Sequence, residues 1–538
     1  MIVSLDTDVL IVGAGPTGLM LANQLVRRGI RVLIVDRNAG PAQQSRALGV
    51  QARPMEIYAK LGLADRALEL GKRGTGANMW AEGRKMARVP FGDVGRHVTA
   101  YPYILILGQD DNERILTERL HDGGVLVQRN SRLIKLSQEA SHVRVTLEQS
   151  GVTQTLTSAW VAGCDGAHST VREGCGIAFD GAPYEHVFFV ADTQVSGRMV
   201  PDEVNVYLWR AGFHLFFPMR GTDHWRIVGI LPAALRDRED VTFEAVLPSI
   251  LQEAGIGLAF SHCSWFSTYR IAHRSAERFR DGRCFLLGDA AHVHSPVGAQ
   301  GMNTGLQDAH NLAWKLALVV QGQAHPALLD SYAAEREPIA RQLLNTTDRA
   351  FKLVVSDGRV AGLLRTRVLA RIGAFAMGFE RIQRLAFRVV SQTGIQYRES
   401  GLSRSGPGFP DAAPRAGDRF PWLKLKLHAD GPVEDVFDAF DDLRFNLVLI
   451  GQPAPVEGMS SEADLLNVHV IPADPVNESE FARVHIPQPS FYLVRPDGYI
   501  ALCGFRADPA AISRYFAENL SFVANATSAP AARSVPSA

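Results

Sequence analysis

A glycine-rich segment near the start of the chain constrains the fold more than any other feature. Gly13-Ala14-Gly15-Pro16-Thr17-Gly18 follows a short apolar run at residues 8–12, and an apolar stretch at residues 19–28 comes next with the spacing of a helix. A second apolar run, residues 31–35, ends at Asp36, about twenty residues beyond the glycines. This order predicts a strand, a tight turn, a helix and a second parallel strand.

Each glycine of this turn has its own physical role. Gly13 permits the tight turn, Gly15 lets the backbone approach a pyrophosphate, and Gly18 lets the helix pack on the strand. The start of the helix offers free N–H groups to phosphates, and we expect Asp36 and the adjacent Arg37 to complete a dinucleotide site. The pattern predicts a Rossmann-like α/β domain, although it does not separate FAD from NAD. A glycine turn without a ligand is the simpler alternative.

Composition limits the kind of partner. The 538 residues exceed what one core holds, which predicts two or three domains. Lys+Arg and Asp+Glu are equal at 56 each, so no basic surface favours nucleic acid or an anionic membrane, and a small molecule is the expected partner. The five cysteines are scattered without metal-ligand spacing, and no apolar run approaches about 18 residues. We expect a soluble, cytoplasmic protein without a metal site.

The spacing of apolar and polar residues changes along the chain. Residues 204–210, 214–218 and 225–230 alternate between apolar and polar side chains and predict an antiparallel sheet. Residues 302–320 have helical spacing, and Arg495-Pro-Asp-Gly498 predicts a hairpin turn. The predicted parts of the chain are a dinucleotide-binding domain at 1–180 and 270–345, an inserted antiparallel sheet at 181–269, a helical segment at 346–400, a C-terminal domain at 401–525 and a disordered tail at 526–538.

Three further segments carry chemistry. The first, Gly163–Arg172, contains Asp165-Gly166, the second is Gly288-Asp289-Ala-Ala-His292, and the third is Pro296-Val-Gly-Ala-Gln-Gly-Met-Asn303. Together with the glycine turn, they resemble the fingerprints of the class A flavoprotein aromatic hydroxylases, the para-hydroxybenzoate hydroxylase superfamily. Within it, the chain is most similar to the phenol hydroxylase and pentachlorophenol 4-monooxygenase branch.

The resemblance implies a role for each motif. Asp289 would bond to the ribityl chain of FAD, Asp165 would lie beside FAD and the nicotinamide cofactor, and the carbonyl of Pro296 would face the substrate and oxygen. The backbone N–H groups of three residues would cradle the pyrimidine end of the flavin, namely Gly301, Met302 and Asn303. The dipole of the helix at 302–320 could then stabilise negative charge on reduced flavin.

Two weaker matches concern single polar residues. Arg46 matches a family arginine that contacts pyrophosphate or the nicotinamide cofactor, and Gln109 matches a glutamine that touches the ribityl chain. Solvated surface positions are the alternative for both.

The resemblance implies an FAD-dependent monooxygenase that hydroxylates a phenolic ring with O2 through a flavin C4a-hydroperoxide. A single nucleotide fingerprint implies that NAD(P)H binds only transiently. Alternatives are a hydroxylase of a polycyclic aromatic polyketide and a non-catalytic or redox-sensing flavoprotein. Related FAD folds include ubiquinone-type hydroxylases, prenyl reductases and halogenases, but the halogenase W-x-W-x-I-P signature is absent.

The group that deprotonates the phenol has no motif. Tyr207, His214 and Trp225 are polar aromatic candidates on the predicted sheet, and ordinary sheet packing is the alternative for each. We expect His292 and His294 to be structural. Arg53 could reach an acidic substrate or form a surface salt bridge.

Two C-terminal segments, Ala-Gly-Asp-Arg-Phe-Pro at 416–421 and Val-Arg-Pro-Asp-Gly-Tyr-Ile-Ala at 494–501, resemble the C-terminal domain of the phenol hydroxylase subgroup. That domain has a thioredoxin-like fold. Here it lacks a Cys-x-x-Cys pair, so thiol redox chemistry is excluded. We expect a structural role, in support of the subunit or of a homodimer contact.

Overall fold

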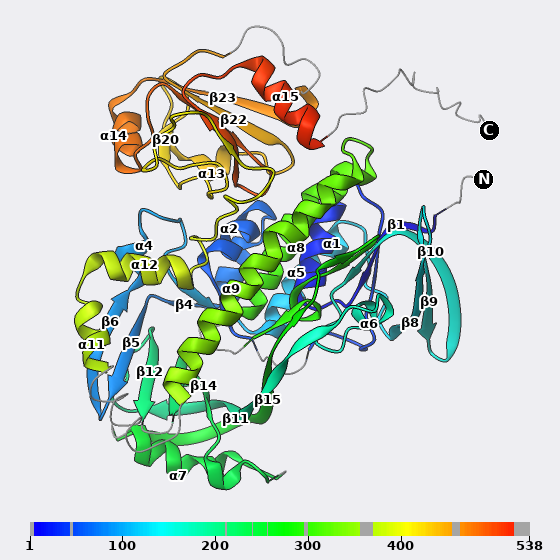
Figure 1. Ribbon diagram of the computed structural model, residues 1–538. Helices are drawn as coiled ribbons and strands as arrows, with labels where there is room; N and C mark the ends of the chain where they lie inside the picture. The colour runs from blue at the N-terminus through cyan, green and yellow to red at the C-terminus, as the bar shows by residue number, and fades with distance from the viewer. Residues whose placement is uncertain are drawn as a thin grey trace, which may run out of the picture.

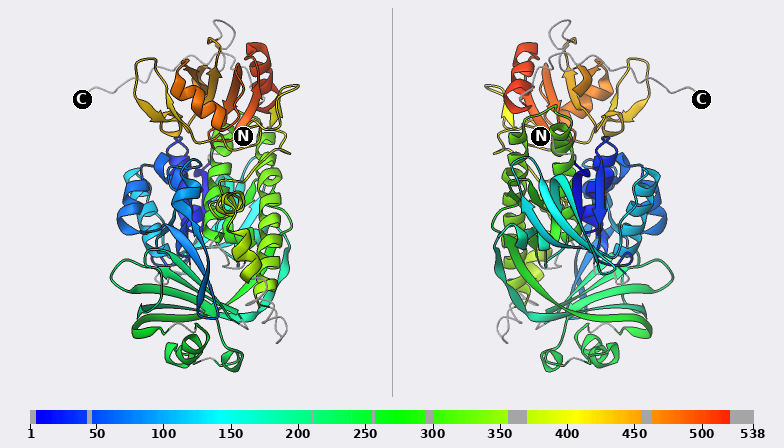
Figure 2. Two further views of the ribbon diagram at one scale, coloured as in Figure 1. Left: turned by 90° about the vertical axis from the view of Figure 1, so that its left-hand side faces the viewer. Right: turned by 90° about the vertical axis from the view of Figure 1, so that its right-hand side faces the viewer.

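The computed structural model describes residues 5–42, 47–209, 212–238, 240–254, 257–294, 300–355, 370–454 and 463–520. Three regions are stacked along one long axis, as Figures 1 and 2 show. An α/β region occupies the middle, an antiparallel sheet with helix α7 lies at one end, and the C-terminal region covers the other end.

The middle region is built on a seven-stranded sheet. Its strands are β16 (Arg280–Asp281), β17 (Cys284–Leu286), β10 (Val152–Gly163), β1 (Thr7–Val12) and β2 (Val32–Val35), with β9 (Val143–Gln149) paired to β10 and β8 (Ser131–Gln138) paired to β9. Strand β1 pairs in parallel with both β2 and β10, and β10 pairs in parallel with β17. The parallel α/β order predicted from the glycine turn is therefore confirmed.

Helices cover this sheet because their apolar faces match its buried strands. They include α1 (Pro16–Val26), α5 (Gln109–Asp122), α6 (Thr170–Gly174) and α8 (Gly301–Val320). Helix α1 begins at Pro16, earlier than the predicted residue 19, because proline suits the first position of a helix. Helix α8 is buried on all sides from Asn303 to Leu318, so it lies in the interior of the protein.

The second sheet has eight strands. They are β18 (His292–Val293), β15 (Ala259–Ala276), β11 (Phe179–Ser196), β14 (His224–Ile230), β13 (Gly212–Pro218), β12 (Val204–Trp209), β5 (Gly76–Ala81) and β6 (Arg84–Pro90). The three predicted strands are present as β12, β13 and β14. The sheet also draws β5 and β6 from residues 76–90, which the sequence assigned to the dinucleotide-binding part. Local alternation could not indicate this, because β5 joins β12 through a long-range parallel pairing.

The two faces of this sheet have different neighbours. Helix α7 (Phe243–Ala254) covers one face, where Phe243, Val246 and Ile250 join its buried side chains. The other face packs against Ile104 and Ile106 of the middle region. A small sheet there consists of β3 (Gly49–Val50), β7 (Ile104–Ile106) and β4 (Lys72–Gly74), and the neighbouring helices are α2 (Ala52–Lys60), α3 (Ala64–Leu70) and α4 (Phe91–Gly95).

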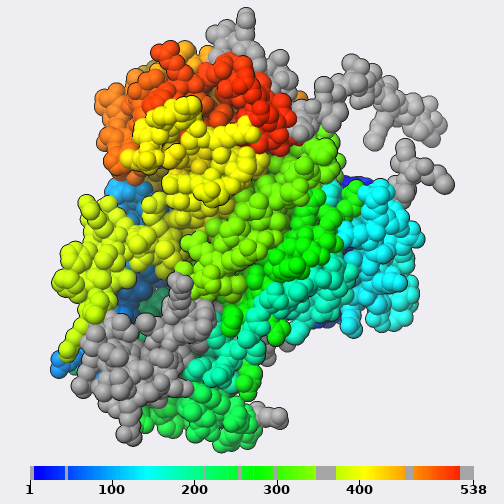
Figure 3. Space-filling model, viewed as in Figure 1, coloured from blue at the N-terminus to red at the C-terminus, as the bar shows by residue number. Residues whose placement is uncertain are grey.

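Helices connect the middle to the C-terminal region. They are α9 (Asp330–Val355), α11 (Ala370–Ala376) and α12 (Glu380–Val390). In Figure 3 the C-terminal region, coloured yellow to red, lies directly against the green surface formed by this part of the chain. No helix in the described ranges is long and apolar enough to cross a lipid bilayer.

The C-terminal region contains a mixed five-stranded sheet. Its strands are β19 (Arg404–Ser405), β25 (Ile500–Gly504), β24 (Ser490–Val494), β22 (Phe445–Ile450) and β23 (Leu466–Ile471), joined by the pair β20 (Lys424–Lys426) and β21 (Val433–Asp435) and by helices α13 (Val436–Ala439), α14 (Pro475–Arg483) and α15 (Pro509–Leu520). Strands β24 and β25 are antiparallel, which confirms the predicted hairpin. The tail at 526–538 lies outside the described residues.

Candidate functional site

A cavity of about 420 Å³ lies where β1, β2 and β10 end. This is the edge at which ligands bind to parallel α/β sheets. Six of the predicted cofactor residues line it: Gly13, Gly15, Asp36, Arg37, Gln109 and Asp165.

The glycine turn forms one wall of the cavity. Gly13 has a φ of +102°, and a Cβ atom there would lie 2.3 Å from the carbonyl oxygen of Cys164. A Cβ atom on Gly18 would lie 2.0 Å from the carbonyl oxygen of Gly13, whereas one on Gly15 would meet no atom within 4 Å. Packing therefore requires glycine at positions 13 and 18, and Gly15 leaves open space for a ligand.

Asp36 ties the end of β2 to this turn. Its carboxylate accepts hydrogen bonds from the N–H groups of Ala14 at 2.7 Å and Asn38 at 2.8 Å. Arg129 lies 4.0 Å from the same carboxylate and also lines the cavity. Arg129 was not predicted from the sequence, because only the long-range bridge between Val35 and Gln128 brings it here. Arg129 and Arg37 give the cavity cationic groups suited to a pyrophosphate.

Gln109 begins α5 and is held by a residue one turn later. Its side-chain amide donates to Glu113 at 2.9 Å, and Glu113 also accepts from the N–H of Ala42 at 2.9 Å. Burial raises the pKa of the Glu113 carboxyl. Glu113 therefore orients the amide of Gln109 at the cavity wall.

Asp165 retains an unused oxygen. Its Oδ2 atom accepts from the N–H of Thr170 at 2.7 Å, while Oδ1 is buried and has no hydrogen-bond partner among the described residues. Burial raises the pKa of this carboxyl. A buried oxygen of this kind is costly unless a bound molecule supplies a donor, and the ribose and ribityl hydroxyls of FAD are suitable donors.

The Gly288-Asp289 turn meets the glycine turn around one side chain. A Cβ atom on Gly288 would lie 2.7 Å from the hydroxyl of Thr17, and one on Gly305 would lie 2.3 Å from it. The starts of α1 and α8 and the Gly-Asp turn are thus in close contact. The Asp289 side chain is exposed in this structure. The protein atoms packed around the turn still partly desolvate its carboxyl group, and this raises the pKa of Asp289. Asp289 is not part of the 420 Å³ cavity lining.

The start of α8 is anchored by Asn303. Its amide donates to the carbonyl of Gly49 at 2.7 Å and accepts from the N–H of Gln51 at 2.8 Å. The side chain of Met302 accepts from Asn112 at 3.1 Å. Gly301 and Met302 thus present the first N–H groups of a fixed helix N-terminus. The side-chain anchor was not predicted, because the resemblance concerned backbone groups only. Pro296 and Arg46 lie outside the described residues.

The three predicted sheet candidates lie away from this site. Tyr207 stacks on Trp80 with ring centroids 5.5 Å apart, and both belong with Trp225 to the cluster on the α7 face. His214 is buried and stacks on Trp209 at 5.5 Å. The structure therefore does not bring Tyr207, His214 and Trp225 to the cofactor cavity. Alternation predicts which residues share a face but not which face meets the rest of the protein.

Tyr207→Phe should leave kcat and KM within about twofold of the parent values. Among the residues that the structure describes, the hydroxyl of Tyr207 donates to the carbonyl of Arg198, at 3.2 Å. Burial raises its pKa, which disfavours a role as a base at neutral pH. Steady-state NAD(P)H oxidation checks this, and a fall in kcat of more than about tenfold would restore Tyr207 as a candidate.

A buried charged network lies behind the Gly-Asp turn. His292 Nε2 lies 2.7 Å from Asp308, and Arg336 donates to the same carboxylate at 2.6 Å. Burial alone would raise the pKa of Asp308, but Arg336 and His292 outweigh it and lower the pKa to about 2. Arg53 is also buried and pairs with Glu56 at 2.9 Å, so its salt bridge is a buried one and not a surface one.

Acid should weaken the fold through Asp308 only below about pH 4. Its pKa is about 2 in the folded chain, below the value of about 3.9 in an unfolded chain, so its contribution is present above pH 4 and is lost as the pH falls toward 2. The contribution is about 2–3 kcal/mol. Urea unfolding of the protein and of Asp308→Asn at pH 7 and pH 3 measures it. Equal losses of stability on acidification in both proteins would contradict the assignment.

The residues present fit FAD: an open position at Gly15, an unsatisfied oxygen on Asp165, and arginines beside a dinucleotide turn. This fold and site define a dinucleotide-binding flavoprotein. The family described as FAD binding domain matches residues 6–347, and the chain belongs to this family.

The chain is similar to known proteins over most of their length. The chain is 34% identical over 512 residues to 6-methylpretetramide 4-monooxygenase of Streptomyces rimosus, covering 93% of this chain and 91% of the relative. It is 33% identical to pentachlorophenol 4-monooxygenase of Sphingobium chlorophenolicum, covering 92% and 86%. Among solved structures, an anhydrotetracycline hydroxylase from Streptomyces rimosus has a TM-score of 0.74 with 30% identity and coverage of 95% and 98%. The chain is therefore an FAD-dependent monooxygenase of the aromatic hydroxylase type.

Proposed function

We propose that this chain hydroxylates a phenolic ring with NAD(P)H and O2, and that the ring binds between the eight-stranded sheet and the FAD-binding region. The supporting observation is the sheet face opposite α7, which is rich in aromatic side chains: Tyr184, Phe188, Phe213, Phe217, Trp265 and Tyr269. Such a face can bury a flat ring and exclude water. Exclusion of water protects the activated oxygen from loss as H2O2.

The chain's own residues would bind and orient the cofactor. Bound FAD, once reduced by NAD(P)H, supplies the activated oxygen. Arg37 and Arg129 would neutralise the pyrophosphate, and Gln109 and Asp289 would bond to the ribityl chain. The N-terminus of α8 would stabilise negative charge on the reduced flavin.

A polycyclic phenol is the favoured substrate within this class. The relatives include enzymes named for 6-methylpretetramide and anhydrotetracycline as well as for pentachlorophenol. Strands β11 and β15 are each 18 residues long, so the sheet face extends well beyond the width of one ring. A single-ring phenol is the second candidate, supported by the pentachlorophenol relative.

The C-terminal region would be a thioredoxin-like domain with a structural role. A mixed sheet of β22 to β25 with α14 and α15 supports this fold. The sequence has no Cys-x-x-Cys pair there, which leaves no dithiol for redox chemistry.

Oxidation of NADH and NADPH by the FAD-loaded protein tests the proposal. Substrates would include single-ring phenols and polycyclic phenols such as anhydrotetracycline, with product mass and H2O2 measured together. We expect a polycyclic phenol to accelerate oxidation and to gain one oxygen atom. If every phenol fails to accelerate oxidation, or if all reducing equivalents appear as H2O2, the proposal is wrong for this class of substrate.

A further inference from the structure

The two C-terminal motifs, residues 416–421 and 494–501, lie against the FAD-binding region rather than on a free surface. Arg419 donates to Glu56 of α2 at 3.0 Å. Arg495 donates to both oxygens of Glu335 in α9, at 2.6 and 2.9 Å. Asp497 accepts from the indole of Trp314 at 3.1 Å. Both motifs therefore hold the C-terminal region against the FAD-binding region, and they are called the docking motifs below.

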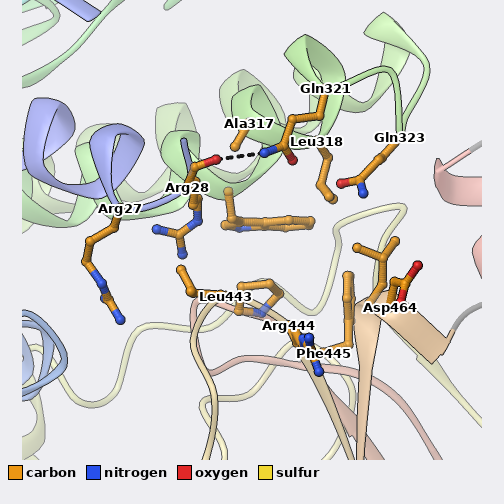
Figure 4. A pocket seen from close by; sticks show the side chains of 13 residues that line it. Arg27, Arg28, Ala317, Leu318, Gln321, Gln323, Leu443, Arg444, Phe445 and Asp464 are labelled. Carbon is orange, nitrogen blue, oxygen red and sulfur yellow. Dashed lines mark hydrogen bonds between the residues drawn. The ribbon is translucent and has the colours of Figure 1, made fainter. Parts of the chain in front are cut away.

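This interface is made of buried charges. Glu335 and Arg495 are fully buried, and Glu335 also accepts from Lys315 at 2.8 Å. Figure 4 looks into a crevice of about 240 Å³ at the same interface, where Arg27 and Arg28 face Leu443 and Phe445 of the C-terminal region. Breaking a buried ion pair leaves an uncompensated charge at a cost of about 3–5 kcal/mol, so these pairs resist displacement of the two parts.

The C-terminal region holds Tyr397 from two sides. The ring of Tyr397 lies against that of Tyr499, with centroids 4.3 Å apart. Its N–H donates to the carbonyl of Gly417 at 2.7 Å. A Cβ atom on Gly417 would lie 2.4 Å from the nitrogen of Arg398, so the two segments are in close contact there. Tyr499 and Gly417 belong to the two docking motifs.

From Tyr397 a chain of buried contacts leads into the FAD-binding region. Arg336 donates to the Tyr397 hydroxyl at 2.8 Å and to Asp308 at 2.6 Å. Arg336 also donates to the carbonyl of Thr304 in the first turn of α8, at 3.2 Å. Arg336 and Asp308 are fully buried. If these contacts were broken, Arg336 or Asp308 would be left as a buried charge without a partner.

The chain of contacts ends on the flavin motif. The second oxygen of Asp308 accepts from the N–H of Gly288 at 3.1 Å and lies 2.7 Å from His292 Nε2. These two residues flank Asp289. The Asp308 carboxylate thus fixes the backbone that carries Asp289.

We propose that the C-terminal region positions the FAD-binding turn at Gly288-Asp289 through Tyr397, Arg336 and Asp308. These three are positioning residues. The proposal rests on FAD binding and not on the identity of the substrate, so its test does not require turnover.

Tyr397→Phe in the full-length protein tests the proposal, because it removes one hydroxyl and keeps the ring. We expect the dissociation constant of FAD, measured by quenching of flavin fluorescence, to rise about tenfold, which corresponds to about 1.4 kcal/mol. The absorption band of the bound flavin should also shift. A dissociation constant within about twofold of the parent would overturn the proposal.

Asp442→Asn is the matched control. Asp442 pairs with Arg27 across the same interface, at 2.8 Å, and within the described part of the chain it forms no hydrogen bond or ion pair with the three positioning residues. We expect it to leave FAD affinity unchanged. An equal loss of affinity in Asp442→Asn and Tyr397→Phe would mean that general loosening of the interface is the cause, and the proposal would be wrong.

Two further variants test the contribution of the C-terminal motif itself. Tyr499→Leu removes the ring that packs on Tyr397 and should raise the dissociation constant of FAD severalfold. Tyr499→Phe keeps the ring and should bind FAD as tightly as the parent. If both variants bind FAD like the parent, the C-terminal region does not act through this contact. Tyr397→Phe decides the question if Tyr499→Leu does not fold.

Discussion

Replacement of Gly15 with valine should abolish FAD binding and leave the apoprotein folded. A Cβ atom at Gly15 meets no atom within 4 Å, and the backbone φ of −76° suits a valine. The side chain would project into the space through which a pyrophosphate approaches the turn. We expect the dissociation constant of FAD to rise at least about 100-fold, or about 3 kcal/mol. Flavin fluorescence titration measures affinity, and circular dichroism during heating measures folding.

Gly13→Ala is the informative contrast. Its Cβ atom would lie 2.3 Å from a carbonyl oxygen, and its φ of +102° disfavours any side chain. We expect the loss to appear in folding itself, at about 4 kcal/mol or more. If Gly15→Val binds FAD like the parent, the phosphates do not approach this turn and the site is misassigned.

The glycine turn could be predicted because its pattern of strand, glycines and helix is local, although one of its constraints is not. A Cβ atom on Gly18 would meet the carbonyl oxygen of Gly13, five residues earlier, whereas one on Gly13 would meet the carbonyl oxygen of Cys164 at the end of β10. A local pattern also predicts the hairpin of β24 and β25, whose turn residues set its geometry. Short-range patterns of this kind are visible in a single sequence.

The orientation of the antiparallel sheet could not be predicted in the same way. Tyr207 and Trp225 share a face, as alternation requires, but that face is covered by α7. The opposite face, with Phe188 and Phe213, meets the FAD-binding region. Only tertiary packing decides which of two apolar faces meets the FAD-binding region, and the sequence does not show that Tyr207 and Trp225 lie on the other face.

Long-range charge pairs could not be predicted from the sequence either. The partner of Arg495 is Glu335, 160 residues earlier, and no motif connects them. The resemblance identified the segment that contains Arg495 without indicating what it contacts. Its physical role follows only from the buried interface with α8 and α9.

Glu335→Gln should cause a large loss of stability at this interface. Glu335 is the shared partner of two buried cations, Arg495 and Lys315, and it also accepts from Ser400 at 2.7 Å. Burial alone would raise the pKa of Glu335, but Arg495 and Lys315 outweigh it and lower the pKa. Removal of its charge leaves Arg495 with the carboxylate of Asp497 and Lys315 with the amide oxygen of Asn311, so Lys315 in particular is poorly compensated, at a cost of about 3–5 kcal/mol. Urea unfolding at pH 7 measures the difference.

The pH dependence of this loss separates the ion pairs from simple packing. Burial lowers the pKa of Lys315 to about 8, and without Glu335 the ammonium group should release its proton more readily. Since an unfolded lysine keeps its proton up to about pH 10.4, rising pH stabilises each folded protein relative to its unfolded chain above the pKa of its Lys315, and the variant, with the lower pKa, gains more than the parent. The difference in the free energy of unfolding between the parent and Glu335→Gln should therefore become smaller between pH 7 and pH 9. Glu380→Gln, at an exposed pair with Arg384, should change stability by less than about 0.5 kcal/mol at either pH. A deficit in Glu335→Gln that stays constant with pH would show that Lys315 does not depend on this carboxylate.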